Sequence, residues 1–178
     1  DIAIKAADSV YAYFIAGDRP FSSAGETEMN LTIGHAFALL YRETGRQAYL
    51  TAAESVVAEW SKEGCGNWFQ DALAGKDFYA MEKKRWEALH GVMTLAELYR
   101  ATGRTEYYTA LENIWRSIAR TDRHNDGGFS SSEGAVGDPY RLEPIETCCT
   151  VAWMALSTDY LKLSHMSCAA DELELSFF

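Results

Sequence analysis

The 178-residue sequence lacks two features that would each define a class of protein. It has no uninterrupted apolar run of about 18 residues, so we predict that it has no membrane-spanning helix. It also has no cluster of Lys and Arg, because 16 basic residues stand against 26 acidic ones and the net charge is −10. Proteins that grip a phosphate backbone need clustered basic side chains, so we predict no nucleic-acid partner.

Sequence motifs for several chemistries are missing as well. There is no GxGxxG or Walker loop for phosphate binding, no GxSxG elbow for serine hydrolysis and no HExxH. The first residues show neither the basic start nor the apolar stretch of a signal peptide, so we predict a cytoplasmic location. The four cysteines form no CxxC pair, which is typical of buried thiols in a reducing compartment.

Apolar residues recur at helical spacing along nearly the whole chain. The clearest helical patterns cover residues 29–40, 49–60, 86–96, 108–118 and 145–163, with an opening helix over 2–15 and a closing one over 169–178. No stretch alternates with a period of two. We therefore predict an all-α fold.

A repeat joins these helices into hairpins. The segment LYRETGR at 40–46 recurs as LYRATGR at 98–104, with six of seven residues identical. Gly45 and Gly103 are expected to take the left-handed position that ends the first helix of each hairpin. A degenerate third copy would place its turn near 164–167. Repeated hairpins build either an open solenoid or a closed toroid.

Two long connections, 61–82 and 122–144, favour the toroid, because loops between bundle helices are usually much shorter. We predict repeated helical hairpins that form part of an (α/α)6 toroid. On this prediction, residues 1–178 are a single domain of about half such a barrel. Half a toroid would expose apolar helix faces, so we expect a homo-oligomer or a partner chain that covers them.

The sharpest candidate for chemistry is the run Glu146-Thr147-Cys148-Cys149. Residues i and i+2 diverge by about 160° in a regular helix, so Glu146 and Cys148 can meet only at a helix start. Pro144, with Thr147 as N-cap, predicts such a start. The helix dipole would then make the Cys148 thiol more acidic, and carboxylate plus thiolate suit zinc. The alternative is two core thiols beside a first-turn acid.

A second catalytic candidate is Glu133, which lies among Ser and Gly in the second long connection. Such a loop can present a general acid to a ligand, and a solvated loop glutamate is the alternative. The candidates for substrate contact are His35, Trp86, Glu87, His90 and His124.

Four of these substrate-contact candidates also have a plain structural alternative. Glu87 and His90 share a helix face at i, i+3 and would bind a ligand or simply cap and pack. His35, on an otherwise apolar helix face, is either a ligand contact or a satisfied core histidine. His124 lies in the loop, where it contacts a ligand or only shapes the turn.

Four segments carry a family resemblance: EMNLTIGH at 28–35, RWEALH at 85–90, the loop 122–140, and IETCCTVAW at 145–153. Together they resemble the β-L-arabinofuranosidase family of glycoside hydrolases, formerly a domain of unknown function. The resemblance runs across nearly the whole chain. It implies an (α/α)6 barrel followed by β-sandwich domains, a carbohydrate substrate, and removal of L-arabinofuranose by a retaining mechanism.

The resemblance also implies roles for single residues. The Glu-Thr-Cys motif of the family supplies a zinc carboxylate and a zinc thiolate, which fall on Glu146 and Cys148. A glutamate of the preceding Gly-rich loop is the family's general acid/base and is best matched by Glu133, although alignment on 137–140 puts it at Gly134 for some relatives. His35 matches a sugar-contacting histidine.

One part of the family's machinery has no counterpart in these 178 residues. The family's nucleophile is a cysteine in a second Cys-Cys pair, well downstream of the Glu-Thr-Cys helix. The resemblance therefore implies a fragment of a zinc-dependent retaining glycosidase that is inactive alone. Two alternatives stay open at this point: a helical-repeat binding or scaffold protein, and a toroid enzyme of the sugar-epimerase kind in which His pairs act.

Overall fold

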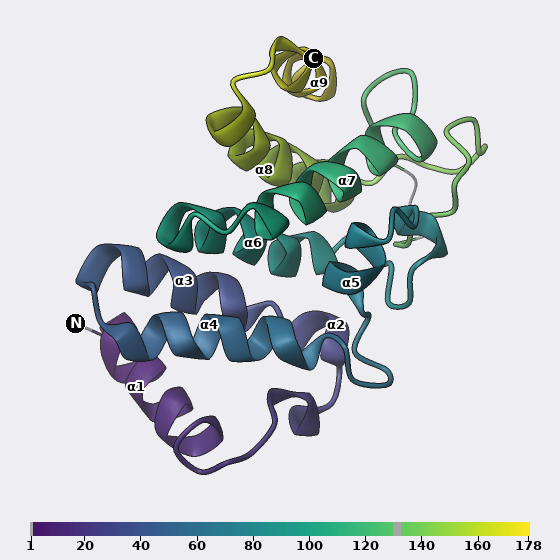
Figure 1. Cartoon of the computed structure of the whole chain (residues 1–178). Helices are drawn as coiled ribbons and strands as arrows, with labels where there is room; N and C mark the ends of the chain where they lie inside the picture. Colours follow the sequence, from purple (N-terminus) through teal and green to yellow (C-terminus); the bar gives the residue numbers. More distant parts are fainter. Residues whose placement is uncertain (1, 130–132) are drawn as a thin grey trace.

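The computed structural model describes residues 2–129 and 133–178, so the serines at 130–132 of the second long connection lie outside it. The described residues are helical and contain no strand, which confirms the predicted all-α fold. The α-helices are α1 (Ile2–Phe14), α2 (Thr27–Asn30), α3 (Ile33–Thr44), α4 (Gln47–Glu59), α5 (Trp68–Leu73), α6 (Ala88–Thr102), α7 (Thr105–Thr121), α8 (Thr147–Ser164) and α9 (Ser167–Phe177), with short 3-10 helices η1 (Phe21–Ala24) and η2 (Phe78–Ala80) (Figure 1).

The helices form successive antiparallel hairpins (Figure 1). Helix α4 packs on α3, α7 on α6 and α9 on α8, while α6 also contacts both α3 and α8. Ten of the fifteen residues of α6 are buried, as expected of a helix enclosed on several sides. Helix α7 instead buries a single stripe, which includes Tyr107, Leu111, Ile114 and Ile118. The helices α3, α6 and α8 thus make an inner row, and α4, α7 and α9 an outer one.

All three hairpins turn in the same way. Gly45, Gly103 and His165 follow the inner helices, and all three have left-handed backbones, with φ of 68°, 70° and 55°. Each of their amides donates a hydrogen bond to the carbonyl four residues earlier, at 2.7, 2.8 and 2.9 Å. The third turn confirms the degenerate repeat near 164–167, with a histidine where the other two copies use glycine.

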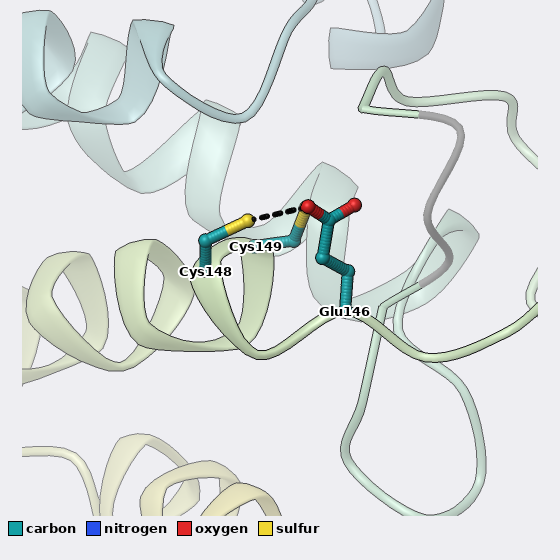
Figure 2. Close-up of side chains that lie close together, drawn as sticks. All are labelled: Glu146, Cys148 and Cys149. Carbon is teal, nitrogen blue, oxygen red and sulfur yellow. Dashed lines mark hydrogen bonds between the residues drawn. The ribbon is translucent and has the colours of Figure 1, made fainter.

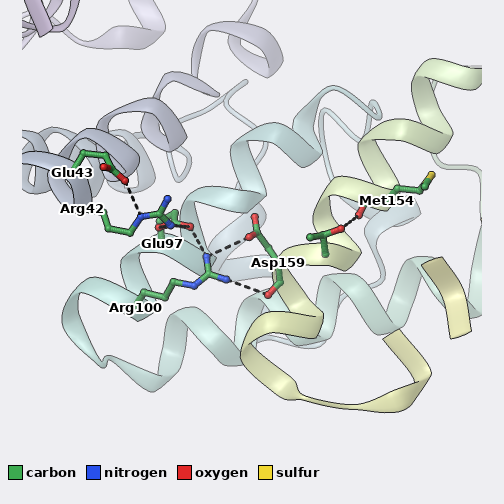
Figure 3. A network of polar contacts seen from close by, with 7 residues as sticks. Arg42, Glu43, Glu97, Arg100, Met154 and Asp159 are labelled. Atoms are coloured by element: carbon green, nitrogen blue, oxygen red, sulfur yellow. Dashed lines mark hydrogen bonds and ion pairs between the residues drawn. The ribbon is translucent and has the colours of Figure 1, made fainter. Parts of the chain in front are cut away.

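An ion-pair network joins the three inner helices near their C-terminal ends (Figure 3). Arg42 of α3 donates to both carboxylate oxygens of Glu97 on α6, at 3.1 and 2.9 Å. Arg100, also on α6, pairs with Glu97 and lies 3.3 Å from Asp159 on α8. Arg42 and Arg100 occupy equivalent positions of the repeat. Each of them pairs with a carboxylate on the next inner helix, Glu97 on α6 and Asp159 on α8.

Both long connections run from the end of an outer helix to the start of an inner one, so they gather on one rim. The first contains α5 and η2, and the second spans from Asp122 to the start of α8. Aromatic packing attaches the second to the core: the Phe129 ring lies 4.6 Å from that of Trp86 and 5.7 Å from that of Trp153. Long loops anchored on a rigid rim are where binding sites tend to lie.

The inner row leaves apolar surface uncovered beside α3. A groove between α1 and α3 is lined only by apolar side chains, which we call the α1–α3 groove: Ala3, Ala6, Ala7, Val10, Ile33, Ala36, Phe37, Leu39 and Leu40. Among the described residues, no helix is long and apolar enough to cross a membrane.

Candidate functional site

The start of α8 places Glu146 and Cys148 together. Glu146 is extended, with φ −115° and ψ 124°, and α8 begins at Thr147, so Cys148 lies in its first turn. The prediction of Thr147 as N-cap is wrong by one residue, since Glu146 takes that position and no side chain caps the helix. The Glu146 amide donates to the carbonyl of Phe129 at 2.9 Å, which fixes where α8 starts.

Three side chains converge at this helix start (Figure 2). The Cys148 Sγ donates to Oε1 of Glu146 at 2.9 Å, and the Sγ of Cys149 lies 3.9 Å from that of Cys148. The ligand atoms of all three residues lie within 4.8 Å of one another. One carboxylate and two sulfurs form a donor set that fits zinc, which binds thiolate, imidazole and carboxylate groups.

The protonation of the two thiols differs from the prediction. The hydrogen bond to Glu146 raises the pKa of Cys148, because loss of the thiol proton would set two negative charges side by side. The expected acidic thiol is therefore wrong for the metal-free chain. Burial raises the pKa of Cys149 to about 12. Both groups are thiols at neutral pH, and binding of a metal has to displace their protons.

The loop that carries Glu133 is joined to the segment before α6. The Trp86 amide donates to the Glu133 carbonyl, and the Ala135 amide donates to the Lys84 carbonyl, both at 3.0 Å. Between these bonds, Arg85 and Gly134 form an isolated antiparallel bridge. This pairing holds Glu133 at the start of α6 with a left-handed backbone, at φ 60°.

Arg85 forms ion pairs with both Glu133 and Glu87. Its Nη2 lies 2.8 Å from Oε2 of Glu133 and 3.1 Å from Oε1 of Glu87. The hydrogen bond from Arg85 holds the pKa of Glu87 below its ordinary value. Both carboxylates therefore pair with the same guanidinium group on the rim.

The rim pocket is a small hollow between the starts of α6 and α8, of about 90 Å³. Its lining residues are Trp86, Glu87, His90, Glu133, Cys148, Cys149 and Ala152. The structure thus brings together five of the predicted site residues from three separate segments of the chain. Ligand pockets of enzymes usually enclose about 300–1,000 Å³, so this hollow is one wall of a site rather than a complete one.

Three predicted residues are not among those that line the rim pocket: Glu146, described above, His35 and His124. His35 is partly buried on α3, and its ring nitrogen lies within 4.8 Å of carboxylate oxygens of Glu97 and Asp159. Burial lowers the pKa of His35. His124 closes a turn through its backbone, since its carbonyl accepts from the Gly127 amide at 2.9 Å.

Sequence reasoning missed two residues that shape the site. One is Arg85, although it stands directly before Trp86 in the segment that carries the resemblance. The other is Asp122, a buried carboxylate whose Oδ1 accepts from the amides of Val136 and Gly137, both at 2.8 Å. Its position at the start of the predicted connection 122–144 gave no sign of a contact 14 residues downstream.

Two rows of paired helices, with carboxylates and thiols on one rim, define a domain of the α/α-toroid kind. A comparison with known families then identifies which one. The family described as β-L-arabinofuranosidase, GH127 catalytic domain, matches residues 1–178, the whole chain. The chain therefore belongs to this family of glycoside hydrolases. No curated protein and no solved structure matches it.

Proposed function

We propose that this chain supplies the metal-binding and acid half of the active site of a retaining, zinc-dependent glycosidase that acts on L-arabinofuranosides. The observation that carries the proposal is the rim pocket, because Glu133 and Cys148 line the same hollow although they come from different parts of the fold. Family membership over the whole chain supports the reaction class.

Each residue has a role on this proposal. Glu133 protonates the glycosidic oxygen as the bond breaks and then takes a proton from water in the second step. Glu146 and Cys148 hold the zinc ion, and bound zinc would supply positive charge that favours a thiolate over a thiol beside it. Trp86, Glu87 and His90 contact the sugar from the same pocket.

The remaining sugar contacts are less direct. His35 and His124 were predicted on the sequence, and both lie outside the rim pocket, so we propose that they meet parts of the substrate that extend beyond it. Among the described residues that line the pocket, one is a histidine, His90. An epimerase that uses paired histidines would need a second one there, so this lining supports the hydrolase.

We propose further that residues 1–178 form about half of a barrel and do not hydrolyse substrate by themselves. The attacking sulfur of the family comes from a second Cys-Cys pair, and none of these residues supplies it. A second copy of the chain is the proposed cover for the α1–α3 groove. The four free thiols fit the proposed cytoplasmic location.

Zinc content and sugar binding together test the function. The purified chain should retain zinc after dialysis and lose it in Cys148→Ser and Glu146→Gln, while Cys168→Ser, a cysteine on α9, keeps it. L-arabinose should shift the indole NH signal of Trp86 in ¹H–¹⁵N spectra, and D-glucose should not. A chain that binds neither zinc nor the sugar would support the scaffold alternative.

A further inference from the structure

The second cysteine of the pair has no role in the function proposed above. Cys149 is 2% exposed, and at the next position of a regular helix its side chain should point about 100° away from that of Cys148. Its sulfur nevertheless lies 3.9 Å from the Cys148 sulfur, and both cysteines line the rim pocket. The Cys149 sulfur also lies within 4.8 Å of a carboxylate oxygen of Glu146 (Figure 2).

The spacing of the two sulfurs matches what zinc requires. Two thiolates bound to one tetrahedral zinc at about 2.3 Å each lie about 3.8 Å apart. The observed separation of 3.9 Å needs almost no movement. A carboxylate oxygen and a thiolate on the same ion lie about 3.6 Å apart, so the 2.9 Å contact of Glu146 with Cys148 has to open by less than about 1 Å.

We propose that Cys149 is a third protein ligand of the zinc ion, so that Glu146, Cys148 and Cys149 form a three-ligand site within one segment of the chain. The inference rests on the zinc site of the proposed function and extends it to a residue outside the Glu-Thr-Cys pair. Three protein ligands with one open position are typical of catalytic zinc sites.

The local structure supports this arrangement over a plain core thiol. The backbone of Glu146 is extended, and its amide donates a hydrogen bond to the Phe129 carbonyl. This backbone conformation brings the Glu146 carboxylate back over the first turn of α8, toward both sulfurs. No lysine or arginine is paired with Glu146 among the described residues, so no fixed cation competes for that carboxylate. By contrast, the carboxylates near His35 are already held by Arg42 and Arg100.

Cobalt substitution counts the thiolates directly. The apo chain is titrated with Co²⁺ under reducing conditions, and sulfur-to-cobalt charge-transfer absorption is recorded in the near ultraviolet. The wild type should show the intensity of two thiolates, and Cys149→Ser should halve it. Loss of a direct ligand should also weaken zinc binding at least about tenfold, since outer-shell changes alone cost that much. The matched controls are Cys65→Ser and Cys168→Ser, which should change neither value.

A measurement on the unaltered chain guards against a variant that fails to fold. X-ray absorption of the zinc-loaded wild type should give two sulfur neighbours, and one sulfur neighbour would overturn the inference. A Cys149→Ser variant that folds and keeps the full charge-transfer intensity would overturn it as well. In both of those cases zinc bound through Cys148 leaves the proposed function intact. A wild type that binds no metal at all removes the inference and the zinc dependence together.

Discussion

Arg42 of α3 and Glu97 of α6 form a two-pronged ion pair, with the Nη1 of the arginine 3.1 and 2.9 Å from the two carboxylate oxygens. Glu97 is 3% exposed and also pairs with Arg100. Removing its charge leaves both arginines without their shared partner. We expect Glu97→Gln to lower the free energy of unfolding by about 2 kcal/mol, measured by urea denaturation.

Glu43 provides the matched control for this prediction. It lies 3.7 Å from the same Arg42, but its side chain is 71% exposed. Exposed ion pairs contribute little, so Glu43→Gln should change stability by no more than about 0.5 kcal/mol. Equal effects of the two variants would show that burial of Glu97 is not what stabilises the row.

The third hairpin turn carries backbone strain that the first two avoid. His165 adopts φ 55°, a conformation that costs side-chain-bearing residues about 1–2 kcal/mol. His165→Gly should therefore raise the melting temperature, with a gain of about 1 kcal/mol in stability. Gly103→Ala should do the opposite by a similar amount, and its new Cβ would meet no atom within 4 Å, so only the backbone is tested. Unchanged melting of both variants would contradict the assignment of the turn.

His35 should make stability depend on pH. Burial holds its pKa below 6.5 in the folded state, whereas in the unfolded chain it titrates near that value. As pH falls through 6.5, His35 binds a proton in the unfolded chain but stays neutral in the folded chain. The contribution of neutral His35 to the free energy of unfolding is therefore present above pH 6.5 and is lost below it. The groups that face His35 are Asp159, Glu97, His90 and Arg100. Urea midpoints between pH 7.5 and 5.5 should fall less steeply in His35→Gln than in the wild type, with His124→Gln as the control.

Asp122 should hold the loop that carries Glu133. Its buried carboxylate accepts two backbone amides, so Asp122→Ala leaves both without a partner and should cost about 2–3 kcal/mol. Hydrogen exchange at the Val136 and Gly137 amides should accelerate. Asp138→Ala removes an exposed acceptor of one amide in the same loop and should leave stability nearly unchanged. Slow exchange at those two amides in Asp122→Ala would exclude this role.

The α1–α3 groove should mediate self-association. Ala36 is exposed within it, and a charge there would meet only apolar side chains. Sedimentation velocity should show an oligomer for the wild type and a monomer for Ala36→Glu. Ala170→Glu, which alters an exposed alanine on α9, should sediment like the wild type. A wild type that remains monomeric at all concentrations would refute the proposal that a second copy of the chain covers the α1–α3 groove.

The fold could be predicted because its signals are local. Helical periodicity and the repeat at 40–46 and 98–104 determine which helices pair and where they turn. Helix α5 was missed because six residues are too few to show a period. The start of α8 differs by one residue from the prediction, which is the usual uncertainty of a helix end.

The site was only partly visible in the sequence, because several of its contacts join residues that are distant along the chain. Glu146 and Cys148 are two residues apart, so spacing alone brought them together. Arg85 and Glu133 are 48 residues apart in the sequence, and nothing in the sequence near Arg85 predicts their contact. The raised pKa of Cys148 depends on which group accepts the hydrogen bond from its thiol, and only the structure shows that this group is the Glu146 carboxylate.

Glu133 and Glu146 are attached to the same pair of aromatic residues. The carbonyl of Glu133 accepts a hydrogen bond from the amide of Trp86, and the amide of Glu146 donates one to the carbonyl of Phe129. The Trp86 and Phe129 rings are in edge contact, with centroids 4.6 Å apart. The proposed proton donor and the proposed metal ligand are therefore anchored to two aromatic residues that contact each other, so we expect a shift of this aromatic pair to move both glutamates together.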